Sequence, residues 1–427
     1  MRPAAAALAL ALLAGPAAAQ KNGETVTLDE VVAAAVRNSP AALAAEQDII
    51  IARQRLREAR FLALPQLSLS GTASRLHLEY PSVLGPELGE RFLDPAISDT
   101  FYTLRAQALQ PLYTGGKNTN TLRLAKAAQS QARVDYETAR ADAALEGKTA
   151  FYELLYRRRA LEAAGRWLER GRALARGLGG DAFERLEVSA LLAGLADAER
   201  RAEGELEAAR TGLLKVLNRE PGYAAEPEGK FETLPVDGDA GSSLVTAMES
   251  RSELKSELYK AQMDDIAVSM ALVKRNPTVY LGASYDVSAY RLADVGDSRA
   301  RANNWLATLA VRFPLSYDIW TQVQQRRAQQ RQGELKRAER QDSVRFEILA
   351  AHREAAARQR EAEGLGTELA AMAASFDEAS RSARPSLAAL RALAALAGLE
   401  QRQLAAVRAQ LLARVKLEWA RGRDFGR

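Results

Sequence analysis

Four runs of the chain alternate between apolar and polar side chains, as β-strands with two different faces do. Two runs lie in the first half, at about 66–80 and 100–113, and two in the second half, at about 278–290 and 303–315. Each alternates over about 10 residues, the length of a tilted membrane strand, although a soluble hairpin packed on a helix would alternate in the same way. The apolar positions are the candidates for contact with lipid: Leu67, Leu69, Tyr102, Leu104, Val279, Leu281, Tyr285, Val287, Trp305, Leu309, Val311 and Phe313.

Outside these runs, two long proline-free stretches have helical character, Lys117 to about Gly171 and Tyr317 to about Arg384. A helix over the first stretch would be roughly 80–90 Å long at 1.5 Å per residue. Helices of ordinary globular domains average about 11–12 residues, so these stretches predict extended coiled-coil hairpins instead. In each half two shorter helices, placed end to end, match the long one: Leu28–Ala63 with Asp181–Asn218, and Leu244–Arg275 with Pro385–Gly422.

The order of elements occurs twice, so the chain is a duplication. Each copy contains a helix, two strands, a long helix and a returning helix, with prolines at matching places. We expect a first repeat at 20–219, a linker at 220–243 and a second repeat at 244–427. The linker contains three prolines and four glycines, which disfavour regular structure. Both pairs of helices leave the strands in the same direction, so the sheet should carry two parallel helical hairpins.

Four strands are too few for a closed barrel, because the smallest barrels have about eight. An open sheet in lipid would leave the polar backbone groups of its edges unpaired. The pattern therefore predicts a mainly α fold with a β-barrel part to which each chain gives four strands. Three chains would supply a barrel of twelve strands.

Residues 1–19 have the features of an export signal: Arg2, a short apolar run at Ala4–Leu13, and small residues at Ala17–Ala19 before the cleavage point. The chain has no cysteine, which excludes disulfides, thiolate metal sites and an N-terminal lipid anchor. The net charge is +5, but arginine and glutamate interleave along the helices. This interleaving is typical of solvated helix faces, so we expect no nucleic-acid partner.

Several segments, in this order, resemble the TolC family of outer-membrane efflux and secretion channels. They are Leu28–Val31 leading to Asn38–Pro40, then Leu64–Leu67, and then Gln110–Gly116 at a strand-to-helix junction. The resemblance implies a homotrimer in the outer membrane, with a twelve-stranded barrel and a helical tunnel in the periplasm. It also implies a passive exit duct for efflux or type I secretion, which docks on a periplasmic adaptor (membrane fusion) protein. An inner-membrane transporter would supply the energy.

The resemblance also directs attention to two sets of residues. Pro111, Gly115, Gly116 and Pro314 mark the strand-to-helix junctions, and Asp181, Glu187, Arg381 and Arg384 lie near the far turns of the hairpins. We hypothesise that the acidic pair of the first hairpin bonds to the basic pair of the second and holds the tunnel aperture shut. The alternative is that these four are solvated turn residues.

No residues with the spacing of an active site stand out, so we expect no enzyme, cofactor or metal. The two histidines, His77 and His352, are far apart in the sequence, whereas metal sites and acid–base pairs need convergent groups. The segment Gly147–Thr149 imitates the end of a phosphate-binding loop, but Asp142 stands where that loop needs glycine. A non-catalytic periplasmic coiled-coil or adaptor protein remains the alternative to a channel.

Overall fold

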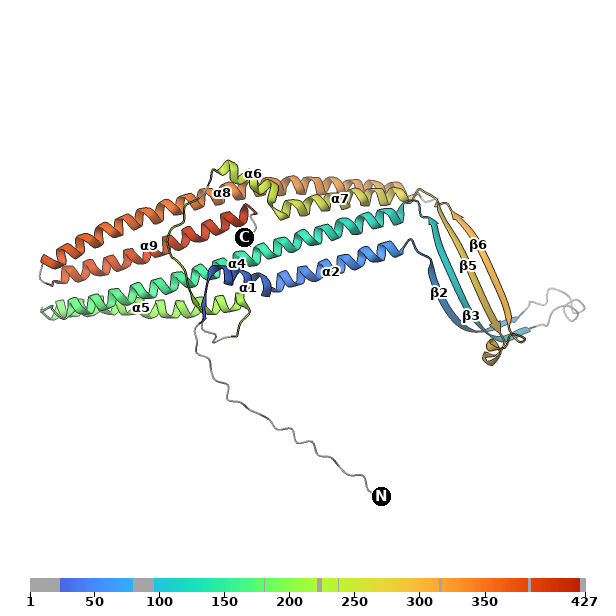
Figure 1. Cartoon of the computed structure of the whole chain (residues 1–427), viewed down its shortest axis with the longest axis horizontal. Helices are drawn as coiled ribbons and strands as arrows, with labels where there is room; N and C mark the ends of the chain where they lie inside the picture. The colour runs from blue at the N-terminus through green and yellow to red at the C-terminus, as the bar shows by residue number, and fades with distance from the viewer. Residues whose placement is uncertain are drawn as a thin grey trace, which may run out of the picture.

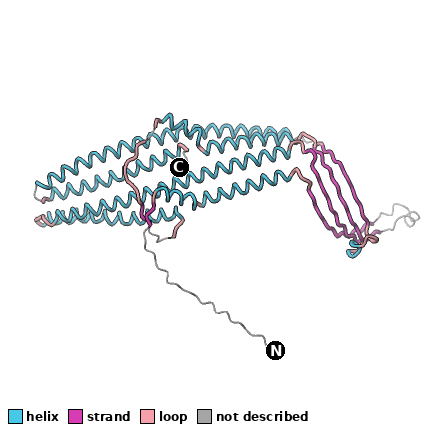
Figure 2. Tube along the Cα trace, viewed as in Figure 1, coloured by secondary structure: helices cyan, strands magenta, loops and turns pink. Residues whose placement is uncertain are grey.

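The computed structural model describes residues 24–79, 96–179, 181–220, 225–236, 238–314, 317–382 and 385–422. The molecule is an elongated rod of helices with a β-sheet at one end, and the two far turns of the helices lie together at the opposite end (Figure 1). Helices make up most of the chain, and the strands are confined to the end sheet and a small equatorial pair (Figure 2). None of the described helices is both long and apolar enough to cross a membrane.

In the first half the elements follow the predicted order. They are β1 (Glu24–Val26), α1 (Leu28–Asn38), α2 (Pro40–Phe61), β2 (Gln66–Glu79), β3 (Ala96–Tyr113), α4 (Lys117–Ala175) and α5 (Ala182–Leu217). The expected single helix at Leu28–Ala63 is divided, because Ser39 takes an extended backbone with φ −61° and ψ 121°. A residue before proline avoids the helical region, so Pro40 starts a new helix with Ser39 as its cap.

The second half repeats this order after a short strand, β4 (Ala225–Pro227). It contains α6 (Ala240–Ser250), α7 (Ser252–Val273), β5 (Thr278–Ala289), the 3-10 helix η1 (Leu292–Gly296), β6 (Ala302–Arg312), α8 (Asp318–Ser382) and α9 (Leu387–Ala420). The predicted helix at Leu244–Arg275 is again two helices, and the first begins at Ala240, inside the predicted linker. The break falls at Arg251, which has φ −66° and ψ 121° without a following proline.

The long helices have the predicted tandem partners. α4 has 59 residues and α8 has 65, so at 1.5 Å per residue they are roughly 90 and 100 Å long. α4 packs against α2 near the sheet and against α5 toward the far end, while α8 packs against α7 and then α9. Side-chain caps start several of the shorter helices, although α7 has none: Thr27 and Glu30 form a capping box on α1, and the Asp181 carboxylate accepts from two backbone amides of α5.

Within each repeat, the tandem helices are bonded to each other at equivalent points where they meet. The last residue of α1, Asn38, donates from Nδ2 to the carbonyl of Leu217 at the end of α5, at 2.9 Å. The last residue of α6, Ser250, donates from Oγ to the carbonyl of Arg421 after α9, at 2.7 Å. Each bond satisfies a terminal carbonyl that has no partner within its helix, so each short helix fixes the end of the returning helix in its own repeat.

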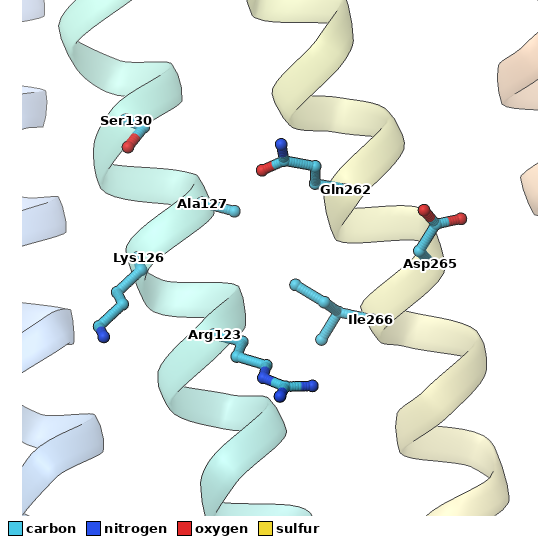
Figure 3. A pocket seen from close by; sticks show the side chains of 7 residues that line it. All are labelled: Arg123, Lys126, Ala127, Ser130, Gln262, Asp265 and Ile266. Carbon is cyan, nitrogen blue, oxygen red and sulfur yellow. The ribbon is translucent and has the colours of Figure 1, made fainter.

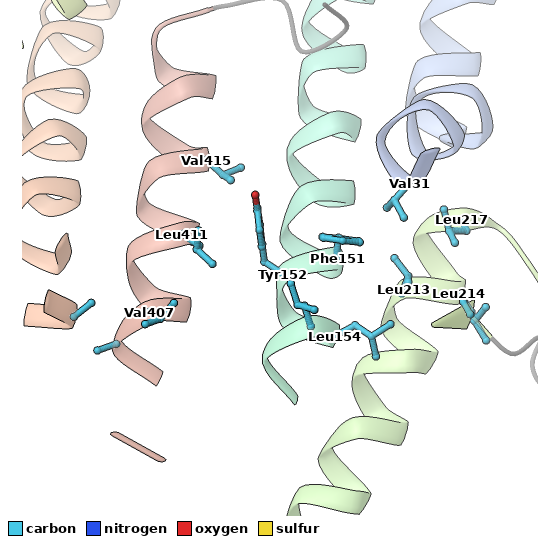
Figure 4. Packing of buried hydrophobic residues seen from close by; sticks show 14 residues of the cluster. Val31, Phe151, Tyr152, Leu154, Leu213, Leu214, Leu217, Val407, Leu411 and Val415 are labelled. Atoms are coloured by element: carbon cyan, nitrogen blue, oxygen red, sulfur yellow. The ribbon is translucent and has the colours of Figure 1, made fainter. Parts of the chain in front are cut away.

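The largest hydrophobic cluster lies at this equatorial level (Figure 4). Phe151 and Leu154 of α4 are nearly inaccessible and pack among Leu213 of α5 and Leu411 of α9. Burial of one such side chain contributes about 1.5–3 kcal/mol. Alanines such as Ala163 fill much of the remaining seam, and they allow the helices to approach closely. The core therefore ties the helices of both repeats together at mid-length.

A strap of extended chain, residues 228–236, crosses this level from α5 toward α6. Its Phe231 ring lies 6.2 Å from the Tyr156 ring of α4. The fully buried Gln410 of α9 accepts a 3.2 Å hydrogen bond from the Leu234 amide and donates to the Leu234 carbonyl. Gln359 of α8 accepts from the Val236 amide at 3.0 Å. This equatorial strap thus binds α4, α9 and α8 in succession.

The end sheet has the strand order β2-β3-β5-β6, with each neighbouring pair antiparallel. β3 of the first repeat pairs with β5 of the second, from Tyr102 opposite Ala289 to Tyr113 opposite Val279, with an irregularity at Pro111. β2 and β6 each have one neighbour within the described chain. β1 and β4 form a separate parallel pair at the equator.

Candidate functional site

One face of the end sheet carries the apolar side chains predicted to meet lipid. The register places Leu69, Ala106, Tyr285 and Trp305 in one row across the four strands, and Trp305 is 78% exposed. Exposed members of the predicted set are Leu67, Leu69, Leu104, Leu281, Tyr285, Trp305, Leu309, Val311 and Phe313. A large exposed apolar surface of this kind marks a contact with lipid or protein.

Three residues of the predicted set are less open in the single chain. Tyr102 and Val279 are half-buried, whereas Val287 is only 6% exposed. Val287 lies opposite Leu104 on β3, and η1 contacts both β3 and β5. The assignment of these residues to a lipid-facing surface stays a prediction.

The junction between β3 and α4 uses two glycines in the left-handed backbone region. Gly115 has φ +66° and Gly116 has φ +97°, values that strain residues with a side chain. A Cβ atom on Gly115 would lie 2.8 Å from the Cβ atom of Asn276, and Asn276 Nδ2 donates to the Gly115 carbonyl at 2.8 Å. Pro314 follows the end of β6 in the second repeat. These glycines let the chain turn sharply from sheet to helix against the end of α7.

Side chains from the same junction also hold the end of α2. Gln110 Nε2 donates to the Ala63 carbonyl at 3.0 Å, and Asn118 Nδ2 donates to the Leu62 carbonyl at 2.9 Å. Pro111, at the strand irregularity, cannot donate a ladder hydrogen bond. The segment Gln110–Asn118 therefore connects the sheet to the ends of both helices that lead into it.

At the far end of the rod the two helical turns touch. A Cβ atom added to Gly177 would lie 3.0 Å from Cγ of Pro385, which belongs to the turn between α8 and α9. Glu187 of α5 makes a two-point ion pair with Arg391 of α9, with distances of 2.6 Å to Nε and 2.7 Å to Nη2. The first and second hairpins are thus bonded to each other at their tips.

The four predicted aperture residues have different positions in this region. Glu187 bonds to Arg391, a residue that the sequence did not single out. Asp181 caps α5, and its Oδ1 atom accepts from the amides of Phe183 and Glu184 at 2.9 and 2.8 Å. Arg381 is exposed near the end of α8, and Arg384 lies outside the described residues. Within one chain Glu187 thus bonds to Arg391, and the hypothesised pairing of Asp181 and Glu187 with Arg381 or Arg384 stays a prediction.

Further bonds between the hairpins lie a few turns above the tip. Arg170 of α4 pairs with Asp377 of α8 at 3.2 Å. Glu400 of α9 accepts from Arg166 at 2.8 Å and also from the indole Nε1 of Trp167, a residue of the buried core. Both contacts join the first hairpin to the second. These contacts were not predicted from the sequence, because arginine and glutamate recur along every helix.

A buried charge cluster lies at the break between α6 and α7. The Arg251 guanidinium is nearly inaccessible, lies 4.9 Å from the Trp419 ring and has Nη2 2.8 Å from Oε2 of Glu347. Trp419 Nε1 donates to Asp142 at 2.8 Å. Partial burial raises the pKa of Asp142, and the Trp419 hydrogen bond partly opposes this shift. The cluster joins α4, α8 and α9 at the break between α6 and α7.

A shallow groove of about 420 Å³ lies between α4 and α7 (Figure 3). Arg123 of α4 points into the groove, whereas Lys126 points toward the α2 side and Asp265 points toward α8, where it accepts from Gln330 at 2.7 Å. His352 lies 3.2 Å from the Gly238 carbonyl at the equator, and His77 is on β2. Within the described part of the chain, no group of three acidic or histidine side chains could hold a metal ion.

The whole fold is similar to that of known outer membrane channels. The CmeC outer membrane channel of Campylobacter jejuni has a TM-score of 0.78 at 16% identity, over 93% of this chain and 86% of that chain. The open state of the MtrE outer membrane channel of Neisseria gonorrhoeae has a TM-score of 0.76 at 16% identity, over 92% of this chain and 88% of that chain. The outer membrane protein VceC of Vibrio cholerae has a TM-score of 0.73 at 16% identity, over 93% of this chain and 96% of that chain.

These similarities show that the chain has the fold of TolC-type channel proteins. Residues 31–176, which begin within α1 and end just after α4, match the family described as outer membrane efflux protein. The resemblance drawn from the sequence is confirmed by this match and by the shared fold. No curated protein sequence matches the chain significantly.

Proposed function

We propose that this chain is one third of a passive exit duct in the outer membrane, through which an efflux or type I secretion system expels its substrates. The observation that carries the proposal is the open four-stranded sheet, with one exposed apolar face and, within the described residues, no strand beyond β2 or β6. In a membrane each unpaired backbone group costs several kcal/mol. Pairing of β6 with β2 of the next copy removes that cost, and three copies give a twelve-stranded barrel.

The helical rod then forms the wall of a periplasmic tunnel that continues the barrel. Its mixed charges suit contact with water on the outside and in the lumen. We infer from the family resemblance that a periplasmic adaptor contacts the helices and that an inner-membrane transporter supplies the energy. The identity of the expelled substrate is then set by the transporter.

The tip contacts support a role in closing the tunnel. The Glu187–Arg391 pair, together with the bonds of Arg170 and Glu400, links the first hairpin to the second at the end distant from the membrane. Exposed ion pairs contribute only about 0.2–1 kcal/mol each. A few such bonds can therefore hold the hairpins together and yet be broken when a partner docks. Asp181, Arg381 and Arg384 stay candidates for residues that hold the aperture shut.

The test is assembly in the membrane, followed by conductance. We expect the exported chain to fractionate with the outer membrane, to need detergent, to migrate as a heat-modifiable trimer and to conduct ions in planar bilayers. Adjacent substitutions on opposite sheet faces provide a matched pair: Leu309→Arg on the apolar face should abolish assembly, at about 2–4 kcal/mol per subunit near the bilayer midplane. Thr308→Arg, on the polar face, should be tolerated.

A water-soluble monomer without conductance would overturn the proposal and favour the periplasmic coiled-coil or adaptor class. Equal tolerance of both arginine substitutions in an assembled trimer would also contradict it, because the apolar face would then not meet lipid.

A further inference from the structure

A single ion pair lies in the middle of the polar face of the end sheet. Arg105 on β3 stands directly opposite Asp286 on β5, and the register extends this row to Ser70 on β2 and Asn304 on β6. Arg105 Nε lies 2.7 Å from Asp286 Oδ1, and Nη2 lies 3.2 Å from Oδ2, so the pair is bidentate. This geometry fixes both charges relative to each other.

The rows beside this pair are uncharged. The row toward the outer end contains Thr72, Thr103, Ser288 and Ala302, and the row toward the helices contains Ser68, Gln107, Ser284 and Leu306. Among the residues of this face whose side chains are described, the other charge is Arg312 at the inner end of β6. Among the described side chains in the middle of this face, only those of Arg105 and Asp286 are charged, so neutralising either one leaves a net charge there.

The pair is also open to solvent. Arg105 is 52% exposed and Asp286 is 20% exposed, so neither charge is enclosed by the sheet. In lipid such exposed charges would be costly. On the face opposite Trp305 and Leu309, however, they meet water if the sheet closes with its apolar face outward. The polar face is then the lumen wall.

We propose that Arg105 and Asp286 are the residues that set the charge of the barrel lumen, and that their mutual neutralisation lets the barrel pass solutes of either sign. This inference rests on the proposed trimeric duct. Twelve strands spaced about 4.8 Å apart and tilted by about 40° give a radius of roughly 12 Å. The Debye length is about 10 Å at 0.1 M salt and 30 Å at 0.01 M. Three unpaired charges at one level would therefore act across the whole opening at low salt.

The absence of cysteine from the chain allows a direct measurement. Asn304→Cys places one thiol in the row of the ion pair, and its rates of reaction with a cationic and an anionic methanethiosulfonate reagent report the local potential in the assembled trimer. Reagent would be added to detergent-solubilised trimer at about 0.01 M salt. In the otherwise unchanged chain, the ratio of the two rates should be close to that of a small free thiol.

Removal of one partner should move this ratio in a sign-dependent way. In the N304C background, D286N should raise the anionic-to-cationic rate ratio at least about threefold, and R105Q should lower it by a similar factor. High salt should suppress both effects. D297N, which removes a carboxylate outside the strands, is the matched charge control and should leave the ratio nearly unchanged. The swapped pair R105D/D286R should restore the original ratio, which separates lumen charge from a purely structural role.

An unreactive N304C thiol in the trimer, or a ratio unmoved by D286N and R105Q, would overturn this inference. The same samples would be tested for trimer migration and conductance. A conducting trimer with an unmoved ratio refutes only the role of the ion pair, whereas a monomer without conductance refutes the duct itself.

Discussion

The equatorial strap gives the sharpest test of how the helices are held together. Gln410 of α9 is fully buried and uses its side-chain amide to bond both backbone groups of Leu234, as a neighbouring strand would. Gln410→Met keeps a similar length and volume but removes both hydrogen bonds. The substitution therefore isolates the bonding contribution from the packing contribution.

The size of the effect follows from the exposure of the strap. Leu234 is 39% exposed, so water can partly replace the lost bonds, and each is then worth about 0.5–1 kcal/mol. The strap should be destabilised by about 1–2 kcal/mol in total, which increases the population of locally opened strap about 5- to 30-fold. Global unfolding should change less, because the helices keep their hydrophobic contacts.

Limited digestion with trypsin measures this opening at a defined bond. Lys230 lies in the strap, and cleavage after Lys230 should accelerate about 5- to 30-fold in Gln410→Met, since cleavage of an opened segment follows its population. Mass spectrometry of the fragments identifies the bond that is cut. Gln403→Met makes the same chemical change at a half-buried position about two turns earlier on α9, and this control should be cut at the rate of the unaltered protein. Equal rates for the two variants would refute the reasoning that the buried amide holds the strap.

Three further predictions concern the junction, the tip and the equatorial cluster. Gly115→Ala should lower the thermal midpoint of the trimer, since its left-handed backbone alone costs about 1–2 kcal/mol and a contact is added; Gly179→Ala, in open space, should not, and equal midpoints would contradict this. Arg391→Glu should raise single-channel conductance by breaking the pair with Glu187, and the reciprocal swap should restore it; unchanged conductance would instead mean that the pair does not close the tunnel. Because the folded-state pKa of Asp142 is raised from 3.8, its stabilising contribution is complete below that pH and is lost as the pH rises. The thermal midpoint of Asp142→Asn should therefore exceed that of the unaltered protein at pH 7, and the difference should be smaller at pH 3.5. A variant midpoint below that of the unaltered protein at pH 7 would count against the burial argument.

The strands and long helices were predictable because their signals are local and repeated. Alternation along β5 is visible in Val279, Leu281 and Tyr285 without knowledge of its partners. Pro40 is a local signal for the break at Ser39, although a single helix was predicted there, whereas no proline follows the equivalent break at Arg251. Periodicity thus specifies the elements but not every interruption in them.

The specific partners of charged and polar residues were not predictable in the same way. Arginines recur along both hairpins, so the choice of Arg391 as the partner of Glu187 depends on the stagger and rotation of the two hairpins. Glutamine is mostly a surface residue, and Gln410 is buried only because the strap crosses it. Such contacts are set by the relative placement of long rods, about which a single sequence contains no local signal.

The seam between β3 and β5 has a consequence for assembly. It joins two similar hairpins edge to edge inside one chain, in the way that β6 and β2 of successive chains would join in the proposed ring. Six hairpins from six separate chains would need six encounters in solution, whereas three duplicated chains leave only three seams to be formed between molecules. The covalent link makes every second seam intramolecular, so its closure no longer depends on protein concentration.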